Sequence, residues 1–191
     1  ATSWDCDKTL VYGLNEKIYQ PEEDKFISYG SCTVNAYVPL GAYMHKKYCI
    51  LDSDVNIIHN IQEYRIEDNN TLNRKFCTLE KSGPALLSFL TEENFVVNYT
   101  VVPYTGVSMI DFRFHFDQCP TRDELIVDLE QSIHEGDLHG IYGMDEVDIG
   151  TEIHNCTTFS SVFIKENIKV INNSVYLPAY FDNENSVNRY Y

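Results

Sequence analysis

The chain has 191 residues, and 14 Lys and Arg against 29 Asp and Glu give it a formal net charge of -15. This length suits a single domain over residues 1–191 with a core of its own, and the 14 Tyr and 10 Phe exclude a disordered chain. The negative charge disfavours nucleic acid and anionic membranes as partners, because affinity for phosphate groups comes from Lys and Arg.

Period-two alternation predicts strands in the first half of the chain. Residues 32–38 alternate through Cys32, Val34, Ala36 and Val38, so we expect a strand there. The glycine and proline of the segment Ser82 to Pro84 predict a turn between two later strands. Apolar and β-branched runs predict those further strands at 55–66, 74–79, 85–90 and 94–102.

The second half of the chain holds the clearest strand and the one predicted helix. Over residues 110–117, an isoleucine and three phenylalanines point one way and charged residues the other. Residues 103–106 separate this strand from the preceding one so narrowly that they predict an antiparallel hairpin. Two more strands are expected at 158–164 and 168–177.

A capping box predicts an amphipathic helix over residues 121–135. The Thr121 hydroxyl can accept from the backbone N–H of Glu124, while the Glu124 side chain reaches back. Gly136 is the expected end. An apolar stripe runs along this helix through Leu125, Ile126, Leu129 and Ile133. About eight strands and one helix together predict a mainly β fold, an antiparallel β-sandwich or β-barrel.

Six cysteines are spread over the chain, and no two stand at a C-x-x-C spacing. An even number of dispersed cysteines favours three disulfides over a zinc site, with free thiols of a cytosolic protein as the alternative. The pairing stays open among 15 connectivities. We therefore expect a disulfide-stapled domain, and the cysteines concerned are Cys6, Cys32, Cys49, Cys77, Cys119 and Cys156.

Four N-x-S/T sequons favour a secreted, N-glycosylated chain. No apolar run approaches the roughly 18 residues that cross a bilayer, which predicts no membrane insertion. The first five residues lack the layout of a signal peptide, as in a chain from which one has been removed. The expected glycosylation sites are Asn69, Asn98, Asn155 and Asn172.

One acidic segment invites comparison with a calcium loop. Asp52, Asp54, Asn56 and Glu63 occupy positions 1, 3, 5 and 12 of an EF-hand register. Position 6 is Ile57 where the loop needs glycine, and the flanks are extended rather than helical. The sequence therefore predicts an acidic turn leading into a strand, and no metal or cofactor.

Other motifs are incomplete. His134 and His139 are five residues apart, which is the wrong spacing for a zinc-binding helix. No G-x-S-x-G, P-loop or G-x-G-x-x-G is present, so we assign no catalytic residue and expect no enzyme. A local acidic cluster is the candidate ligand-binding site, formed by Asp145, Glu146, Asp148 and Glu152.

Two families resemble the chain in part. Its length, β content and late helix are similar to those of lipocalins, although Thr2 to Trp4 lacks the glycine of their G-x-W. Its acidity and the stretch from Gly106 to Pro120 resemble secreted poxvirus chemokine-binding proteins, without their closely spaced cysteine pair. Neither resemblance identifies a family.

The function expected from these features is that of a secreted binding protein that sequesters or carries an extracellular ligand. A lipocalin-like carrier and a viral or parasite-type immunomodulator are both compatible with it. Its acidity favours a cationic protein or a small amphipathic molecule as the partner. The alternatives are a secreted hydrolase with an unrecognised active site and an adhesion or receptor ectodomain.

Overall fold

The computed structural model describes residues 5–67 and 71–189, so the Asn69 sequon lies outside the described residues. Over these described residues, the fold is a mixed α/β arrangement with three α-helices and an eight-stranded sheet. In chain order, the strands and α-helices are β1 (Lys8–Thr9), β2 (Ile27–Ser28), α1 (Cys32–Tyr48), β3 (Ile50–His59), β4 (Asn73–Arg74), α2 (Leu79–Leu86), β5 (Phe95–Val101), β6 (Ser108–Phe116), α3 (Arg122–Glu135), β7 (Tyr142–Asp145), β8 (Ser161–Ile164), β9 (Lys169–Ile171) and β10 (Ser174–Phe181). Short 3-10 helices are η1 (Glu16–Ile18), η2 (Glu63–Arg65), η4 (Glu152–His154), η5 (Lys165–Asn167) and η6 (Asn185–Arg189).

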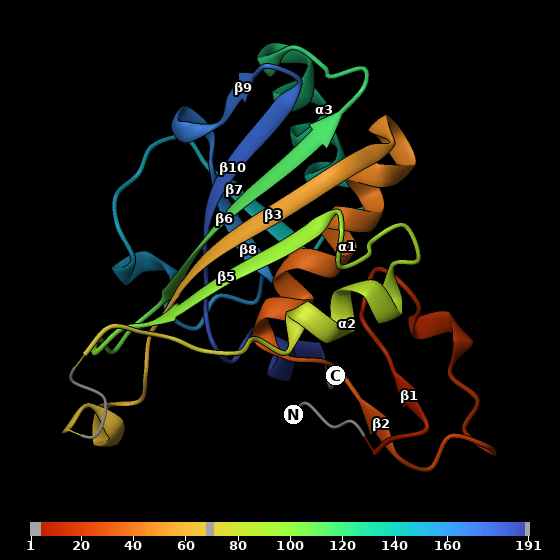
Figure 1. Cartoon of the computed structure of the whole chain (residues 1–191), viewed down its shortest axis with the longest axis vertical. Helices are drawn as coiled ribbons and strands as arrows, with labels where there is room; N and C mark the ends of the chain where they lie inside the picture. The colour runs from red at the N-terminus through yellow and green to blue at the C-terminus, as the bar shows by residue number, and fades with distance from the viewer. Residues whose placement is uncertain (1–4, 68–70, 190–191) are drawn as a thin grey trace.

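The large sheet has the strand order β4-β5-β3-β6-β10-β8-β7, and β9 pairs with β10. Strand β3 runs parallel to β5 and antiparallel to β6. Figure 1 shows these strands side by side, with α1 and α3 behind them. Because β3 lies between β5 and β6, the hairpin predicted across residues 103–106 is wrong. The sheet is open and mixed, so the antiparallel sandwich or barrel is wrong as well.

The strand predicted over residues 32–38 is also wrong, since these residues begin helix α1. The reason is burial on every side. All residues from Thr33 to Gly41 are buried, and a helix that is apolar all round shows no amphipathic period. The turn predicted at residues 82–84 is wrong, because these residues lie within α2. The strand predicted at residues 85–90 is wrong at its start, since α2 ends at Leu86.

Two local predictions are confirmed. Strand β6 alternates as expected, with Ile110 and the phenylalanines at 112, 114 and 116 buried. Helix α3 has Thr121 as its N-cap, and both hydrogen bonds of the capping box with Glu124 are present. Gly136 is its C-cap.

The predicted disulfides are wrong, because all six cysteines are free. Cys32 begins α1 and Cys49 is its C-cap, so 17 residues of helix hold them about 25 Å apart. An even count of cysteines carries no information about which thiols a fold brings together. No helix in residues 5–67 and 71–189 combines the length and apolarity that a bilayer span requires.

A buried tyrosine forms hydrogen bonds with the backbone at the centre of α1, where a proline interrupts the helix. Pro39 lies inside this helix, and proline lacks an N–H and disturbs the preceding turn. The Tyr142 hydroxyl, from β7, donates to the carbonyl oxygen of Ala36 at 2.8 Å and accepts from the N–H of Leu40 at 3.0 Å. These bonds fix α1 against the sheet at the level of its interrupted turn.

Candidate functional site

A thiol and an imidazole meet at the N-terminal end of α1. The Sγ atom of Cys32 lies 3.4 Å from Nε2 of His59. Cys32 is the first residue of α1, and His59 is the last residue of β3. Ser31 caps the helix by accepting from the N–H of Val34 at 3.3 Å. The start of a helix and the end of the central strand thus bring together two residues that are 27 positions apart.

Two opposing effects act on the Cys32 thiol. Burial and, after it, the neighbouring Cys77 raise its pKa to about 12. The backbone N–H groups of Thr33 and Cys32, at the positive end of the helix, act in the opposite direction. Because desolvation dominates, Cys32 is a neutral thiol at neutral pH. It therefore needs a base to become a nucleophile.

His59 has the tautomer that such a base requires. Its Nδ1 atom lies 2.6 Å from the carbonyl oxygen of Asn60. A carbonyl oxygen only accepts, so Nδ1 carries the proton and Nε2 presents its lone pair to the Cys32 thiol. Burial lowers the pKa of His59, which keeps the ring neutral and able to accept a proton at pH 7. Tyr99 and Phe181 flank the ring at centroid distances of 5.3 and 5.9 Å.

A pocket of about 440 Å³ opens beside this pair. Arg65 of η2 and Lys75 line the same pocket, together with the Asn183 amide that follows β10. It therefore combines a nucleophile, a base and two cationic side chains, with one carboxylate, that of Glu184. Such an arrangement suits addition of the thiol to an electrophilic carbon of a small anionic molecule.

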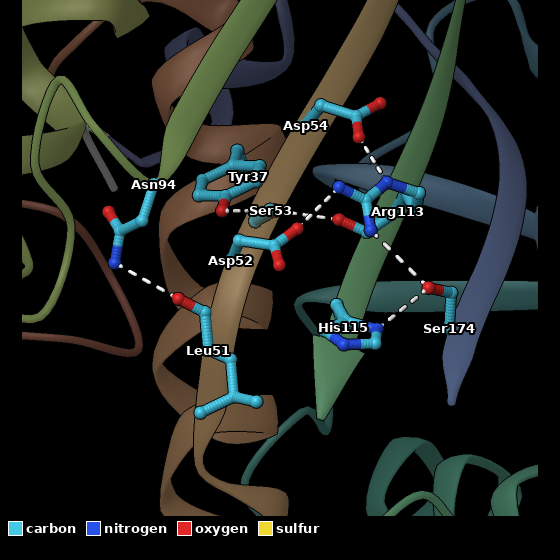
Figure 2. Close-up of polar contacts among 9 residues, drawn as sticks. All are labelled: Tyr37, Leu51, Asp52, Ser53, Asp54, Asn94, Arg113, His115 and Ser174. Carbon is cyan, nitrogen blue, oxygen red and sulfur yellow. Dashed lines mark hydrogen bonds and ion pairs between the residues drawn. The ribbon is translucent and has the colours of Figure 1, made fainter. Parts of the chain in front are cut away.

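The four candidates for a calcium loop are not brought together around a common point. Asp52 and Asp54 project from β3 and both bind Arg113 of β6, as Figure 2 shows. A guanidinium thus lies where a cation would be needed. Asn56 lies further along β3 and Glu63 lies in η2. In the described part of the chain, no group of three or more His, Cys, Asp or Glu residues could hold a metal ion.

Side chains of the acidic cluster contact other residues of the same protein. Glu146 pairs with Lys165 at 2.9 Å, and Asp148 accepts from the Tyr180 hydroxyl at 2.9 Å. Asp145 lies 3.6 Å from His154, which belongs to the same 3-10 helix as Glu152. No contact in the structure tests ligand binding there or the cationic partner, so both stay predictions.

The sequons within the described residues differ in accessibility. Asn155 and Asn172 are exposed, whereas Asn98 is half-buried in β5 and accepts from Arg74 at 3.0 Å. Glycosylation at these positions stays a prediction.

Sequence reasoning missed the Cys32–His59 pair because it treated all cysteines as disulfide partners. One local signal was present. Ser31 directly before Cys32 is a typical N-cap residue, and a helix N-terminus is a place where thiols are activated. The partner His59 had no local signal, since its approach depends on the position of β3.

The chain is similar to curated enzymes over almost its whole length. It is 28% identical over 188 residues to the glyceraldehyde-3-phosphate dehydrogenase of Claviceps purpurea, covering 91% of this chain and 55% of the relative. The cytosolic enzyme of Pisum sativum is 29% identical over 196 residues, 92% of this chain and 55% of the relative. The enzyme of Geobacillus stearothermophilus is 27% identical over 191 residues, 93% of this chain and 57% of the relative.

The chain spans about half the length of the curated relatives it matches. No family model matches it. The similarity to dehydrogenases overturns the expectation of a non-enzymatic binding protein and that of a hydrolase or ectodomain. Two relatives are cytosolic by name, those of Pisum sativum and Nicotiana tabacum, and all six cysteines are free. Both findings overturn the expectation of a secreted protein.

Proposed function

We propose that the chain is a dehydrogenase domain of the glyceraldehyde-3-phosphate dehydrogenase type, in which Cys32 attacks the aldehyde carbon of a small anionic substrate. The observation that carries this proposal is the 3.4 Å contact between the Cys32 thiol and Nε2 of His59. The names of the relatives supply the substrate class, a phosphorylated aldehyde. Their names and the free thiols also support a cytosolic location.

The first step follows from the protonation states. His59 takes the Cys32 proton on Nε2 while Sγ forms a bond to the aldehyde carbon, and the C=O π bond breaks. The carbonyl oxygen then receives that proton from Nε2, which gives a neutral hemithioacetal and restores neutral His59. Atoms and charge balance without a further reactant.

Oxidation of this adduct requires a hydride acceptor, for which dehydrogenases use a nicotinamide dinucleotide. The residues of this chain do not fit such a group. Its sequence has no G-x-G-x-x-G turn to hold a pyrophosphate, and the pocket beside Cys32 has only about 440 Å³. We therefore assign to these residues the thiol chemistry and substrate positioning alone.

Arg65 and Lys75 are the residues we assign to the anionic end of the substrate. Both line the pocket that contains Cys32 and His59. A cation in a partly enclosed pocket attracts phosphate and orients it by charge-assisted hydrogen bonds. The chain is acidic overall, but in this pocket two cations stand against the one carboxylate of Glu184, which favours the anionic end of a substrate.

The test measures alkylation of each cysteine by iodoacetamide, resolved by peptide mass spectrometry. We expect His59→Gln to slow alkylation of Cys32 at pH 7 by about tenfold or more, because loss of a general base costs about 10²–10⁴ in rate. The exposed Cys156 is the internal control and should react at an unchanged rate. Equal Cys32 rates in the two proteins would contradict the proposal.

Substrate class is tested in the same assay by protection. Glyceraldehyde 3-phosphate should protect Cys32 at lower concentration than unphosphorylated glyceraldehyde. Lys75→Gln and Arg65→Gln should remove that difference, whereas Lys46→Gln, on the far end of α1, should retain it. If both aldehydes protect Cys32 at the same concentration, the assignment of Arg65 and Lys75 is wrong.

A further inference from the structure

A buried serine lies behind the thiol–imidazole pair, at the junction of three segments. Ser108 begins β6 and is 1% exposed. Its Oγ atom accepts from the N–H of Asn60 at 3.1 Å and donates to Oδ1 of Asn183 at 2.8 Å. The Asn183 amide in turn donates to Oδ1 of Asn60. The side chains of Ser108 and Asn183, together with the side chain and the backbone N–H of Asn60, close a ring of hydrogen bonds between the ends of β3 and β10 and the start of β6.

This ring holds Asn60, the residue whose carbonyl oxygen sets the tautomer of His59. The carbonyl oxygen of Asn60 holds the Nδ1 proton of His59 at 2.6 Å, and the N–H of the same residue is held by Ser108. Asn60 is itself 5% exposed, so no bulk water replaces a lost bond readily. Ser108 holds the peptide before Asn60, and the following peptide, which carries the Asn60 carbonyl, is held where the Ile61 N–H donates to the Tyr104 carbonyl at 2.9 Å. The Ser108 hydroxyl is therefore one of two bonds that set the orientation of the Asn60 backbone.

We propose that Ser108 is a positioning residue, which holds the Asn60 backbone so that His59 keeps its proton on Nδ1 and its lone pair toward Cys32. The proposal rests on the proposed thiol chemistry and assigns to it a residue that touches neither the thiol nor the imidazole. Second-layer hydrogen bonds of this kind fix which ring nitrogen of a histidine is available for chemistry.

The other charged and titratable groups around His59 come from different elements. They are Cys32 on α1, Tyr99 on β5, Cys77 before α2 and Glu184 after β10, with Arg65 and Lys75 in the same pocket. The hydrogen-bond partners of the Ser108 hydroxyl are Asn60 and Asn183, and none of these titratable groups is among them. Any effect of removing the Ser108 hydroxyl on the protonation of His59 is therefore transmitted through Asn60.

The experiment is the pH profile of Cys32 alkylation in Ser108→Ala. We expect the plateau at neutral pH to fall about tenfold, because a fraction of His59 then carries its proton on Nε2 and cannot act as the base. The acid limb should move to lower pH, since the bond to Asn60 raises the pKa of His59 and would be weakened. Ser108→Thr keeps the hydroxyl and should restore both features.

Ser53→Ala is the matched control. Ser53 is a buried serine of β3, 2% exposed, that accepts from the Tyr37 hydroxyl and donates to the Arg113 carbonyl, the contacts drawn in Figure 2. Its loss should lower the melting temperature as much as Ser108→Ala and leave the pH profile unchanged. A merely structural role for Ser108 predicts the same profile for both variants.

A folded Ser108→Ala protein with the wild-type plateau and acid limb would overturn the proposal. If that variant does not fold, Ser108→Cys carries the same expectation, because sulfur fills the space but is a weak hydrogen-bonding atom. The two proposals fail differently. If Cys32 is alkylated at the wild-type rate in His59→Gln, the proposed thiol chemistry is wrong. If alkylation is slower in His59→Gln but the Ser108 variants have the wild-type pH profile, only the positioning role is wrong.

Discussion

At the scale of single residues, the half-buried His59 and the buried His154 both titrate below their ordinary pKa. Burial lowers the pKa of both His59 and His154. His154 is 3% exposed and stacks on Tyr180 at a centroid distance of 5.0 Å. Among the described residues its Nε2 atom has no hydrogen-bond partner, and the nearest Asp145 oxygen is 3.6 Å away. Charging either ring inside the protein therefore costs more than charging it in the unfolded chain.

Stability should fall on acidification as a consequence. A lowered pKa in the folded state means that the unfolded chain binds more protons, so the free energy of unfolding rises with pH in this range. The loss begins as pH falls through the unfolded value of 6.5. We expect the melting temperature to drop between pH 7 and pH 5, measured by circular dichroism.

Substitutions of single histidines show which residue causes the dependence of the melting temperature on pH. His154→Gln should flatten the dependence, because glutamine has no charge to gain. His134→Gln, at an exposed position of α3, should leave it as in the wild type. A melting temperature that is flat from pH 7 to pH 5 in the wild-type protein would be incompatible with this account.

At the scale of elements, α1 is the one that organises the site. It carries Cys32 at its start, is buried on all sides from Thr33 to Gly41, and contains Pro39. Its interrupted turn depends on Tyr142, whose hydroxyl serves both Ala36 and Leu40. Burial raises the pKa of this hydroxyl, so it stays protonated and able to donate.

Removing the hydroxyl should therefore destabilise the protein. Tyr142→Phe leaves a buried carbonyl and a buried N–H without this partner, at a cost of about 1–3 kcal/mol in the free energy of unfolding. Urea denaturation measures it. Tyr176→Phe, on an exposed part of β10, is the control and should change stability by less than about 0.5 kcal/mol. Equal stabilities of the two variants would show that Tyr142 contributes only packing.

At the scale of the whole molecule, burial of apolar side chains stabilises the fold, without disulfides. One core contains the large side chains of α1, β6 and β10, and the six thiols are free. This arrangement requires no oxidising compartment.

The thiols provide a direct test. A reductant should leave the melting temperature unchanged, and Ellman's reagent should count six thiols in denaturant. In the native protein, the exposed Cys49 and Cys156 should react before the buried Cys77, which should react only on unfolding. Fewer than six thiols in freshly isolated, denatured protein would contradict the structure.

The sequence by itself determined the features that depend on near neighbours. The capping box of α3 needs only Thr121 and Glu124, and the alternation in β6 needs only the pleat of one strand. Both were predicted correctly because their physical causes lie within a few residues.

The tertiary structure alone decided α1, the mixed sheet and the site. Residues 32–38 read as a strand because burial on every side removes the helical period, and β5 and β6 are separated by a strand that comes earlier in the chain. Cys32 and His59 meet only because β3 occupies the centre of the sheet. Contacts between distant residues depend on which strands become neighbours, and that order is settled by packing of the whole chain.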